Sequence, residues 1–361
     1  MQRRGFLQGA AGSAFAQSAA PPIRAALMIE PAGDHLGYYY RTGLCAGVSE
    51  FAVADETGES FGAARKALGE RSIGTYRDPV QMMTEFRPQL VVVSMEPARM
   101  PAAIEVALQH GAHVVVEKPA CTKLEQFEKL ANLARSNEKQ LMLAMPTRLH
   151  PAVIRARELI QAGWIGRPYG VDMLWIADQT RLKNPVYQRT WKASKSKGGG
   201  GKLIFHGIHY LDVIHYLTGD RISNVCGFCR NVGGQPIEVE DAAVVSMVFA
   251  GGMVGTLNTG YYLDRGYAHL VALWGADGWF RFTPWEPEIL TWYSTANAAP
   301  RGVQRQVGGP VATYDLMLQA AVDFAAGRRE PFMTTADSLA ALRTVFAAYR
   351  AAETGQSQRV G

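Results

Sequence analysis

The sequence predicts an α/β protein with two parts: a doubly wound parallel sheet, then an α+β domain with an open, largely antiparallel sheet. Three observations lead to this fold class. The chain has 361 residues, which is long enough for two hydrophobic cores. In its first half, short apolar runs alternate with helical patterns of about ten residues, as in βαβ units. In its second half, longer alternating strands follow one another across short glycine turns.

The first half begins with buried, apolar strand patterns, each followed by a helix. The predicted strands lie at 23–29, 51–54, 90–94, the three valines 114–116, and 141–144. The predicted helices lie at 38–41, 62–68, 79–86, 101–110 and 124–136, and Asp78 is expected to cap the third of them. This alternation is typical of a Rossmann-like domain.

The strand around Val114–Val116 is the centre of the prediction. Gly111 ends the helix before it, three valines follow, and Glu117 and Lys118 come directly afterwards. Ligands of an open α/β sheet bind at the carboxyl ends of its strands. Lys118 is therefore expected to be an electrostatic anchor or a proton-transfer group, unless the pair is simply solvated.

A second carboxylate lies where a dinucleotide fold places one. Asp55 follows the strand at 51–54, about 22 residues beyond Gly33, the spacing at which an acidic side chain meets a ribose hydroxyl. A carboxylate there repels a 2′-phosphate, so NAD is favoured over NADP. We expect a dinucleotide-binding domain at 21–145 and a substrate and oligomerisation domain at 146–361.

The second domain is predicted from a different pattern. Its strands are expected at 170–176, 222–232, 242–250, 253–260, 269–275 and 279–282, and its helices at 152–162, 208–217, 314–326 and 338–352. Glycine turns such as Gly251-Gly252 join neighbouring strands, which predicts a mixed and largely antiparallel sheet. A sheet face of this kind often pairs with its copy, so a homodimer or homotetramer is expected.

Composition excludes several classes of protein. The net charge is +5, but the basic residues are scattered, which argues against a nucleic-acid groove. No apolar stretch reaches the roughly 20 residues that span a bilayer. Cys226 and Cys229 have CxxC spacing inside a predicted strand, which places them on opposite faces as two packed thiols. No second pair completes a zinc site, so no metal is expected.

The N-terminus differs from the rest of the chain. Arg3-Arg4 precede Phe6-Leu7 and a weakly apolar run, and 14–16 offers a small-x-small cleavage site. This resembles a twin-arginine export signal, with a frayed basic terminus as the alternative. We assign residues 1–20 to the signal and expect a periplasmic or otherwise exported protein, or a cytoplasmic one if the signal is not used.

Several motifs in order then resemble the Gfo/Idh/MocA oxidoreductase family. They are Glu117-Lys118-Pro119, Arg148 and Pro151, residues 155–160 and 163–168, the run 199–212 (GGGKLIFHGIHYLD) and residues 347–355. The resemblance extends from about residue 23 to the end. It implies an enzyme that uses NAD or NADP to oxidise or reduce a sugar or cyclitol carbon.

The resemblance also implies roles for individual residues. Lys118 would contact both the nicotinamide ribose and the reacting hydroxyl, and His209 would accept the proton. A base near neutral pKa must touch the hydroxyl oxygen as hydride leaves, and a nearby ammonium stabilises the developing alkoxide. Gly33, Gly37, Asp55, Glu117 and Lys118 are the expected cofactor-binding residues.

Further substrate contacts are expected from five residues: Arg148, Trp191, Lys202, His206 and Asp212. Arg148 is equally a candidate for a structural pin between the domains. Tyr187, Trp191 and Lys202 are included because they flank the glycine run. Two other roles remain open for His206. It could form a metal site with His209 and Asp212, or it could be a residue at the start of a helix that is hydrogen-bonded to backbone. His215 is expected to pair with Asp212.

The chain departs from the family pattern at three places. Only Gly33 and Gly37 remain of a G-x-G-x-x-G loop, and Glu30 and Asp34 add negative charge where a pyrophosphate would lie. Met95-Glu96 replaces the family's Thr-Pro. Phe205 replaces the acid four residues before His209, and His206 or Asp212 are candidates to substitute for it.

Three functions remain open from the sequence. The first is a sugar or cyclitol oxidoreductase whose cofactor, if the protein is exported, travels bound and is recycled in place. The second is a redox-cycling glycosidase or lyase on the same scaffold. The third is a non-enzymatic sugar-binding protein whose nucleotide site has decayed.

Overall fold

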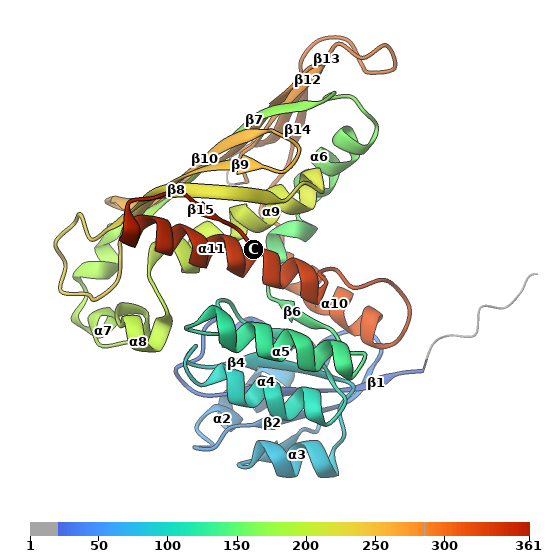
Figure 1. The fold of residues 1–361 in the computed structure, drawn as a ribbon. Helices are drawn as coiled ribbons and strands as arrows, with labels where there is room; N and C mark the ends of the chain where they lie inside the picture. The colour runs from blue at the N-terminus through green and yellow to red at the C-terminus, as the bar shows by residue number, and fades with distance from the viewer. Residues whose placement is uncertain (1–20, 285) are drawn as a thin grey trace, which may run out of the picture.

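The computed structural model describes residues 21–284 and 286–361, which form two sheets with their covering helices (Figure 1). The predicted export signal at 1–20 lies outside the described residues. No helix in the described part of the chain is long and apolar enough to cross a membrane.

The first sheet has six parallel strands in the order β3-β2-β1-β4-β5-β6. The strands are β1 (Ile23–Ile29), β2 (Val48–Ala54), β3 (Gly74–Tyr76), β4 (Leu90–Ser94), β5 (His113–Val116) and β6 (Leu141–Leu143). Because β1 lies between β2 and β4, the strand order reverses beside it, at the place where such sheets bind ligands. The predicted parallel sheet is confirmed.

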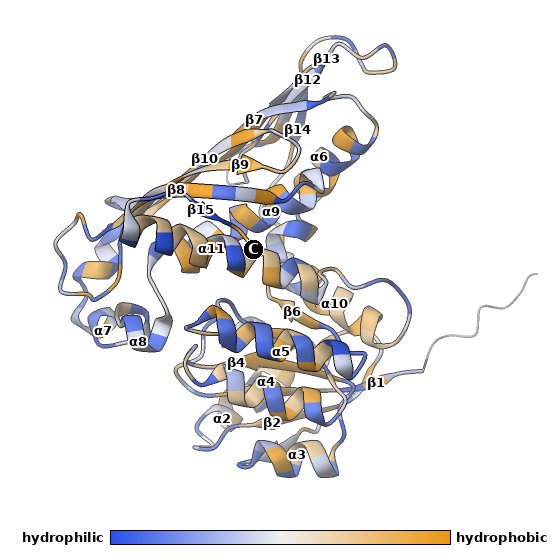
Figure 2. Ribbon diagram, viewed as in Figure 1, coloured by the Kyte–Doolittle hydropathy of each residue, from blue (hydrophilic) through white to orange (hydrophobic). Residues whose placement is uncertain are grey.

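Helices connect these strands along both faces of the sheet. They are α1 (Leu36–Tyr39), the 3₁₀ turn η1 (Tyr40–Leu44), α2 (Ser60–Leu68), α3 (Pro79–Glu85), α4 (Met100–Gln109) and α5 (Leu124–Ser136). Asp78 caps α3 as predicted, since its side chain accepts a hydrogen bond from the Val80 N–H at 2.8 Å. Hydrophobic and hydrophilic residues are mixed along α3, α4 and α5, as expected for helices with one face on a sheet (Figure 2).

The second sheet has nine strands in the order β14-β13-β12-β11-β7-β10-β9-β8-β15. They are β7 (Pro168–Asp178), β8 (Ile222–Arg230), β9 (Ala242–Phe249), β10 (Val254–Leu263), β11 (Ala268–Gly275), β12 (Gly278–Phe282), β13 (Glu288–Ser294), β14 (Gln304–Val307) and β15 (Gln358–Arg359). Only the pair β7 and β10 among these described strands is parallel, so the predicted mixed, largely antiparallel sheet is confirmed.

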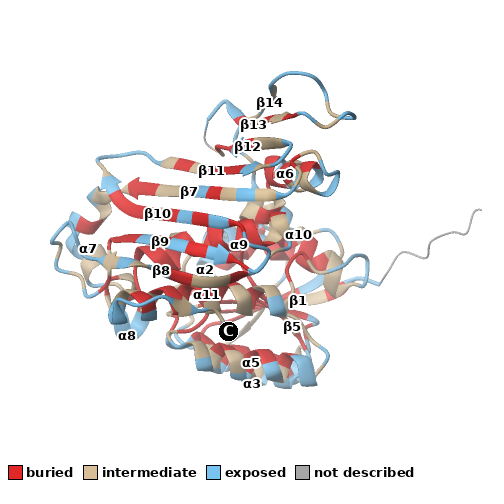
Figure 3. Ribbon diagram, turned by 45° about the horizontal axis from the view of Figure 1, so that its top comes forward, coloured by how far each residue is buried: buried red, intermediate tan, exposed pale blue. Residues whose placement is uncertain are grey.

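The helices of the second half gather on one face of this sheet and toward the first sheet (Figures 1 and 3). They are α6 (Pro151–Gln161), α7 (Pro185–Gln188), α8 (Lys195–Gly198), α9 (Ile208–Thr218), α10 (Thr313–Ala325) and α11 (Thr335–Thr354). The short turns are η2 (Pro146–Leu149), η3 (Gln179–Lys183), η4 (Trp191–Ala193) and the π-helical η5 (Leu203–Gly207).

Helix α11 links the two sheets through the edge strand β6. The backbone N–H of Leu141 donates to Thr335 Oγ1 at 2.9 Å, and that of Leu143 donates to Ser338 Oγ at 3.1 Å. These side chains occupy donors that an edge strand otherwise leaves unpaired. The C-terminal helix therefore holds the sheet that carries Lys118 against the second half of the chain.

Two local expectations are revised by the structure. Cys226 and Cys229 lie in β8 with free thiols, as predicted, but Cys226 is exposed, so the prediction of two packed thiols is wrong for it. Strands β3, β13, β14 and β15 were not predicted; β3 has three half-buried residues and β15 has two residues, too few to show a period.

Candidate active site

Lys118 lies at the carboxyl end of β5, next to the reversal in strand order. Its side chain is 5 % exposed, and its Nζ lies 3.6 Å from Glu117 Oε1. Three buried strands, β1, β4 and β5, fix this position because their apolar segments pair residue by residue. A buried ammonium at a strand end is thus held rigidly rather than displayed on the surface.

Glu117 is a positioning residue for Lys118. It is fully buried, and its N–H donates to the Val93 carbonyl at 2.8 Å. Its Oε2 accepts from the Tyr39 hydroxyl and lies 3.3 Å from His35 Nδ1. Burial and the carboxylate of Glu117 together raise the pKa of Tyr39, so this phenol stays a donor. Glu117 therefore joins the loop after β1 to the end of β5.

His209 comes from the other half of the chain. It is the second residue of α9, directly after the π-helical turn η5, a distortion that often accompanies functional sites. No partner is present for its buried Nδ1 among the described residues, and its ring centroid lies 5.2 Å from that of Trp175. Burial, and then the positive charge of Lys118, lower the pKa of His209 well below its ordinary value.

Lys118 and His209 are 91 positions apart in the sequence, and the charge of Lys118 acts on the imidazole of His209 in the fold. Their catalytic roles stay a prediction. The imidazole is neutral and has an unused ring nitrogen, which is the state of a general base. The ammonium beside it is suited to stabilise negative charge on an oxygen.

Lys202 and His206 lie in the same cluster. Lys202 is fully buried, and its Nζ lies 4.4 Å from the centroid of the Tyr261 ring. The hydroxyl of Tyr261 lies 3.4 Å from His206 Nδ1, so His206 bonds to a side chain and not to backbone as one prediction had it. Burial, and then the charges of Lys202 and Lys118, lower the pKa of His206.

Arg148 and Asp212 have a structural role, which replaces the predicted substrate contact. Both are buried, at 3 % and 1 % exposure of their side chains, and two bonds of 2.8 and 2.7 Å join them. Arg148 also contacts Asp337 of α11 at 3.2 Å. His215 does not pair with Asp212; its Nε2 accepts from the Ile222 N–H at 3.3 Å. Of the two alternatives for Arg148, the structure supports the pin.

Trp191 is likewise a joint rather than an open contact. Its side chain is buried, its Nε1 donates to the Ala32 carbonyl at 2.8 Å, and its ring packs edge-on against Phe205. The neighbouring Lys192 pairs with Asp34 at 3.0 Å. The predicted substrate contact of Trp191 is therefore revised to a contact that ties η4 to the loop after β1.

The loop after β1 is where a pyrophosphate is expected, and its acids are not free. Glu30 accepts from the Glu96 N–H and from Arg99. Burial raises the pKa of Asp34, but Lys118, His35 and Lys192 outweigh it, and the net pKa lies below the ordinary value. Lys118, Lys192 and Arg99 offset the negative charge that the sequence placed in this loop.

Gly33 in this loop meets a close approach. A Cβ on it would lie 2.4 Å from the carbonyl oxygen of Ser94, at the end of β4. Gly37 has no such neighbour within 4 Å. Only the first of the two predicted loop glycines is therefore required by packing.

Asp55 lies at the end of β2 as predicted. Its Oδ1 accepts from the N–H and hydroxyl of Thr57 at 3.0 and 2.9 Å, and its Oδ2 accepts from the Ser60 N–H at 2.8 Å. Burial raises the pKa of Asp55, but these hydrogen bonds lower it by more than burial raises it, so the carboxylate is ionised. Oδ2 can accept a further hydrogen bond, as a ribose hydroxyl requires. The contact with a ribose stays a prediction.

Models of one protein family match both halves of the chain. The NAD-binding Rossmann fold of the oxidoreductase family GFO_IDH_MocA matches residues 35–145, and the GFO/IDH/MocA C-terminal domain matches residues 153–281. Together they cover more than half of the chain. The chain belongs to the Gfo/Idh/MocA oxidoreductase family. The part of the family that matches residues 35–145 is its NAD-binding Rossmann fold.

Individual relatives are distant. A dehydrogenase, aclE, of Aspergillus oryzae is 29% identical over 170 residues, 47% of this chain and 45% of that protein. The levoglucosan dehydrogenase of Pseudarthrobacter phenanthrenivorans is 24% identical over 277 residues, 70% of this chain and 69% of that protein. The crystal structure of an oxidoreductase domain protein from Kribbella flavida has a TM-score of 0.81 at 22% identity, covering 95% of this chain and all of that one.

The matches to the first curated relatives are partial. This chain spans 57%, 45% and 34% of their respective lengths. The match therefore does not assign the activity of those whole proteins to this chain. Membership of the family rests on the family models instead.

Phe205 occupies the position where the resemblance to this family leads us to expect an acid. Its buried ring has the Lys118 ammonium 5.8 Å from its centroid and packs against Trp191. Asp212 is already paired with Arg148, so it does not substitute for the missing acid. His206 lies next to Phe205 in the cluster, but its Nδ1 faces Tyr261. The carboxylate that this Gfo/Idh/MocA chain holds next to Lys118 is therefore Glu117, and Phe205 leaves an apolar ring where the acid is expected.

Sequence reasoning missed several members of the site: His35, Tyr39, Trp175, Arg181 and Tyr261. None belongs to the motifs that carry the resemblance. Trp175 and Tyr261 lie near the carboxyl ends of the paired strands β7 and β10. Aromatic residues are common in all strands, so neither residue marks a site in the sequence. The run Tyr38-Tyr39-Tyr40 after Gly33 was the one visible signal, because buried phenols need hydrogen-bond partners.

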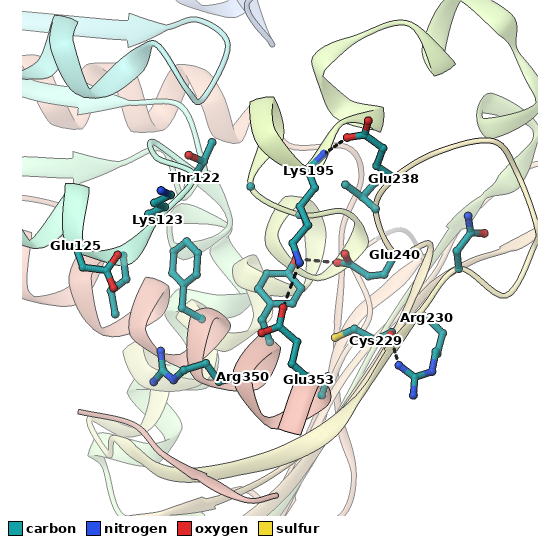
Figure 4. Close-up of a pocket in the computed structure, with 18 residues that line it drawn as sticks. Thr122, Lys123, Glu125, Lys195, Cys229, Arg230, Glu238, Glu240, Arg350 and Glu353 are labelled. Atoms are coloured by element: carbon teal, nitrogen blue, oxygen red, sulfur yellow. Dashed lines mark hydrogen bonds and ion pairs between the residues drawn. The ribbon is translucent and has the colours of Figure 1, made fainter. Parts of the chain in front are cut away.

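A large cavity of about 630 Å³ lies beside the glycine run (Figure 4). It is lined by residues of α8, β8, α11 and the start of α5 rather than by Lys118 or His209. Glu240 lines this cavity. Its carboxylate accepts hydrogen bonds from the Gly201 N–H at 2.8 Å, the Leu203 N–H at 2.9 Å and the Tyr349 hydroxyl at 2.8 Å. Glu240 therefore holds the turn that leads to His209.

Replacing Glu240 with Ala is expected to lower the free energy of unfolding by about 1–3 kcal/mol, because buried backbone donors lose their acceptor. Urea unfolding measures this. Glu238→Ala is the matched control, because the carboxylate of Glu238 binds the exposed Ser194 and Lys195 instead. Equal effects of the two variants would contradict the role given to Glu240.

Among the described residues no group of three His, Cys, Asp or Glu side chains is placed to hold a metal ion. His206, His209 and Asp212 face different partners, as the preceding contacts show.

Proposed function

We propose that this chain oxidises or reduces a CH–OH group of a sugar or cyclitol with NAD. The observation that carries the proposal is the burial of Lys118 and neutral His209 together, at the strand end where the family's Rossmann domain binds its ligand. A levoglucosan dehydrogenase among the relatives supports the sugar as substrate class.

The residues present fit a dinucleotide. The loop with Gly33 follows β1, the acids of that loop are paired with cations, and Asp55 ends β2. Gly33, Asp55 and Lys118 would hold NAD, with Glu117 fixing Lys118. When bound, NAD supplies the hydride acceptor for the carbinol carbon.

The side chains then divide the remaining work. In the oxidation direction, His209 removes the proton of the substrate hydroxyl with its free ring nitrogen. Lys118 stabilises the negative charge that develops on that oxygen, in a site from which water is largely excluded. Trp175 fixes the plane of the imidazole by contact with its face.

The oxidation rate is expected to stay constant as the pH falls through about 6.5, where an ordinary histidine gains its proton. A base acts only when deprotonated, and the pKa of His209 lies well below its usual value because of burial and Lys118. The measurement is kcat at saturating substrate between about pH 5 and 9. An acidic limb with a midpoint near 6.5 would contradict this assignment of the base.

The presence of the cofactor is tested directly. The purified full chain is denatured, and the supernatant, analysed by mass spectrometry, is expected to contain NAD. If none is retained, the folded chain is expected to bind added NAD stoichiometrically. A folded protein that neither holds nor binds any nicotinamide nucleotide would remove the redox function.

We also propose that the cofactor is kept and recycled in place. The support is the arginine pair before Phe6-Leu7 in the sequence, since export would separate the protein from the cytoplasmic nucleotide pool. Rapid exchange of bound NAD with isotope-labelled NAD during turnover would argue against recycling. Cleavage of a glycoside without net NADH would favour the glycosidase or lyase alternative.

The uncovered face of the second sheet supports self-association. Val244 and Val248 of β9, Val254 of β10 and Trp274 of β11 are exposed. They share one face, because Val254 pairs with Val248, and Gly170 of β7 pairs with both Val254 and Trp274. We propose a homodimer or homotetramer formed through this face. Light scattering of the wild type and of Val248→Asp tests it, with a shift toward monomer expected for the variant.

A further inference from the structure

Lys202 is an unusual residue in the cluster around Lys118. Its side chain is fully buried, and no hydrogen-bond partner for its Nζ is present among the described residues. A buried ammonium is normally paired with a carboxylate, because burial without a partner removes its hydration. Its Nζ lies over the face of Tyr261, 4.4 Å from the ring centroid.

The neighbours of Lys202 add positive charge instead of compensating it. Arg181 lies over the same Tyr261 ring at 5.5 Å and donates to the Tyr267 hydroxyl at 3.0 Å. In the described ranges, neither Lys202 nor Arg181 takes part in an ion pair. Burial, and then the charges of Arg181 and Lys118, lower the pKa of Lys202 to about 6.

The carboxylates of the region are engaged elsewhere. Asp34 pairs with Lys192, Glu117 with Lys118 and Tyr39, and Glu240 with the backbone of the glycine run. The cluster therefore has two basic groups, Lys202 and Arg181, without an anion from the chain. Because its pKa is about 6, the amine of Lys202 takes up its proton when an anion binds beside it. An anion supplied by a ligand would pair with both.

Neutral donors surround the same point. Tyr187 is hydrogen-bonded to Tyr261, and burial raises the pKa of both phenols, so they remain protonated. Tyrosine hydroxyls and cations together form the usual set that receives a carboxylate group. This set lies on η3, η5, α7 and β10, whereas the residues expected to hold the dinucleotide follow β1 and β2.

We propose that Lys202 and Arg181 bind a carboxylate of the substrate, so that this enzyme acts on an acidic sugar such as a uronic or aldonic acid. The proposal rests on the function proposed above and names its substrate class. Lys118 and His209 act at the hydroxyl that reacts, and the acid group is held on the side of Tyr261.

The test compares acids with neutral analogues of the same size. Calorimetric titration of the NAD-loaded full chain uses glucuronate, galacturonate and gluconate, each beside its amide, with glucose 6-phosphate as the phosphate arm. At least one acid is expected to bind about 10-fold or more tightly than its amide, because a charge-assisted bond is lost in the amide.

Two variants assign the effect to the cluster. Lys202→Met keeps the volume of the side chain, and Arg181→Gln keeps a donor; each is expected to weaken binding of the preferred acid about 10-fold or more and to leave its amide unchanged. Lys183→Met is the matched control, because Lys183 lies in the same turn η3 but is exposed beside Asp264. The melting temperature of Lys202→Met is expected to stay equal or rise, because an unpaired buried charge is removed.

The outcomes separate this inference from the function on which it rests. The carboxylate site is overturned if the acids bind no more tightly than their amides, or if Lys202→Met binds the preferred acid as tightly as the wild type does. This holds even if neutral sugars reduce NAD. Preference for the sugar phosphate overturns the carboxylate assignment as well. Lys202-dependent binding of an acid without any NADH formation supports the site but removes the oxidoreductase function.

Discussion

Replacing Lys118 with Ala is expected to reduce kcat about 100- to 1000-fold, the loss typical of removing one group that stabilises negative charge in a transition state. Lys118 is held by Glu117 at the end of β5, so its ammonium is already in place when substrate binds. Steady-state kinetics with the substrate that proves active measures the loss.

The effect of Lys118→Ala must be separated from a general loss of charge. Lys129→Ala removes the same charge from an exposed position, where Lys129 pairs only with Glu105 at 3.1 Å, and is expected to leave kcat unchanged. Circular dichroism melting is expected to show Lys118→Ala folded. Retention of more than about a tenth of wild-type kcat would contradict the role of Lys118.

Replacing Arg148 with Met is expected to lower the free energy of unfolding by about 3–5 kcal/mol, because the buried carboxylate of Asp212 loses its partner. The two bonds between them are 2.8 and 2.7 Å long, and both side chains are almost fully enclosed. Urea unfolding at pH 7 measures the change. A loss below about 1 kcal/mol would show that the pair behaves like a surface ion pair.

A second variant and pH support the interpretation. Arg148→Met combined with Asp212→Leu is expected to recover much of the lost stability, because no charge is then left unpaired, and Asp337 keeps Arg221 at 2.7 Å. In Arg148→Met alone, burial raises the pKa of Asp212 above its unfolded value. Its stability is then highest below the unfolded pKa and falls as the pH rises. Arg155→Met, at an exposed pair, is the control.

The parallel sheet was predictable because its strands are short, apolar and separated by amphipathic helices. The run Leu90–Ser94 was predicted with the bounds that β4 has, and the three valines that predicted the next strand lie in β5. The second sheet was predictable in kind, since glycine turns join alternating strands. Its edge strands β14 and β15 were not, because a pair of residues or a polar run has no period that marks a strand.

The candidate site was predictable only in part. Lys118 and His209 were identified by motif, and the structure places them together. Arg148 and Asp212 belong to the same motifs, but their chemistry is used within the protein, because each is the other's nearest countercharge once the chain is folded. A sequence position does not tell whether a charged side chain meets another side chain or a ligand.

The sequence by itself determined the fold class, the family resemblance and the residues around which chemistry is centred, because these depend on local periodicity and on the order of motifs. Only the tertiary structure decided which charges are paired and which are left over. Lys202 and Arg181 gather at Tyr261 from segments that the sequence keeps apart, without a carboxylate from the chain. Electrostatic energy depends on distance and burial in space, and neither is visible along the chain.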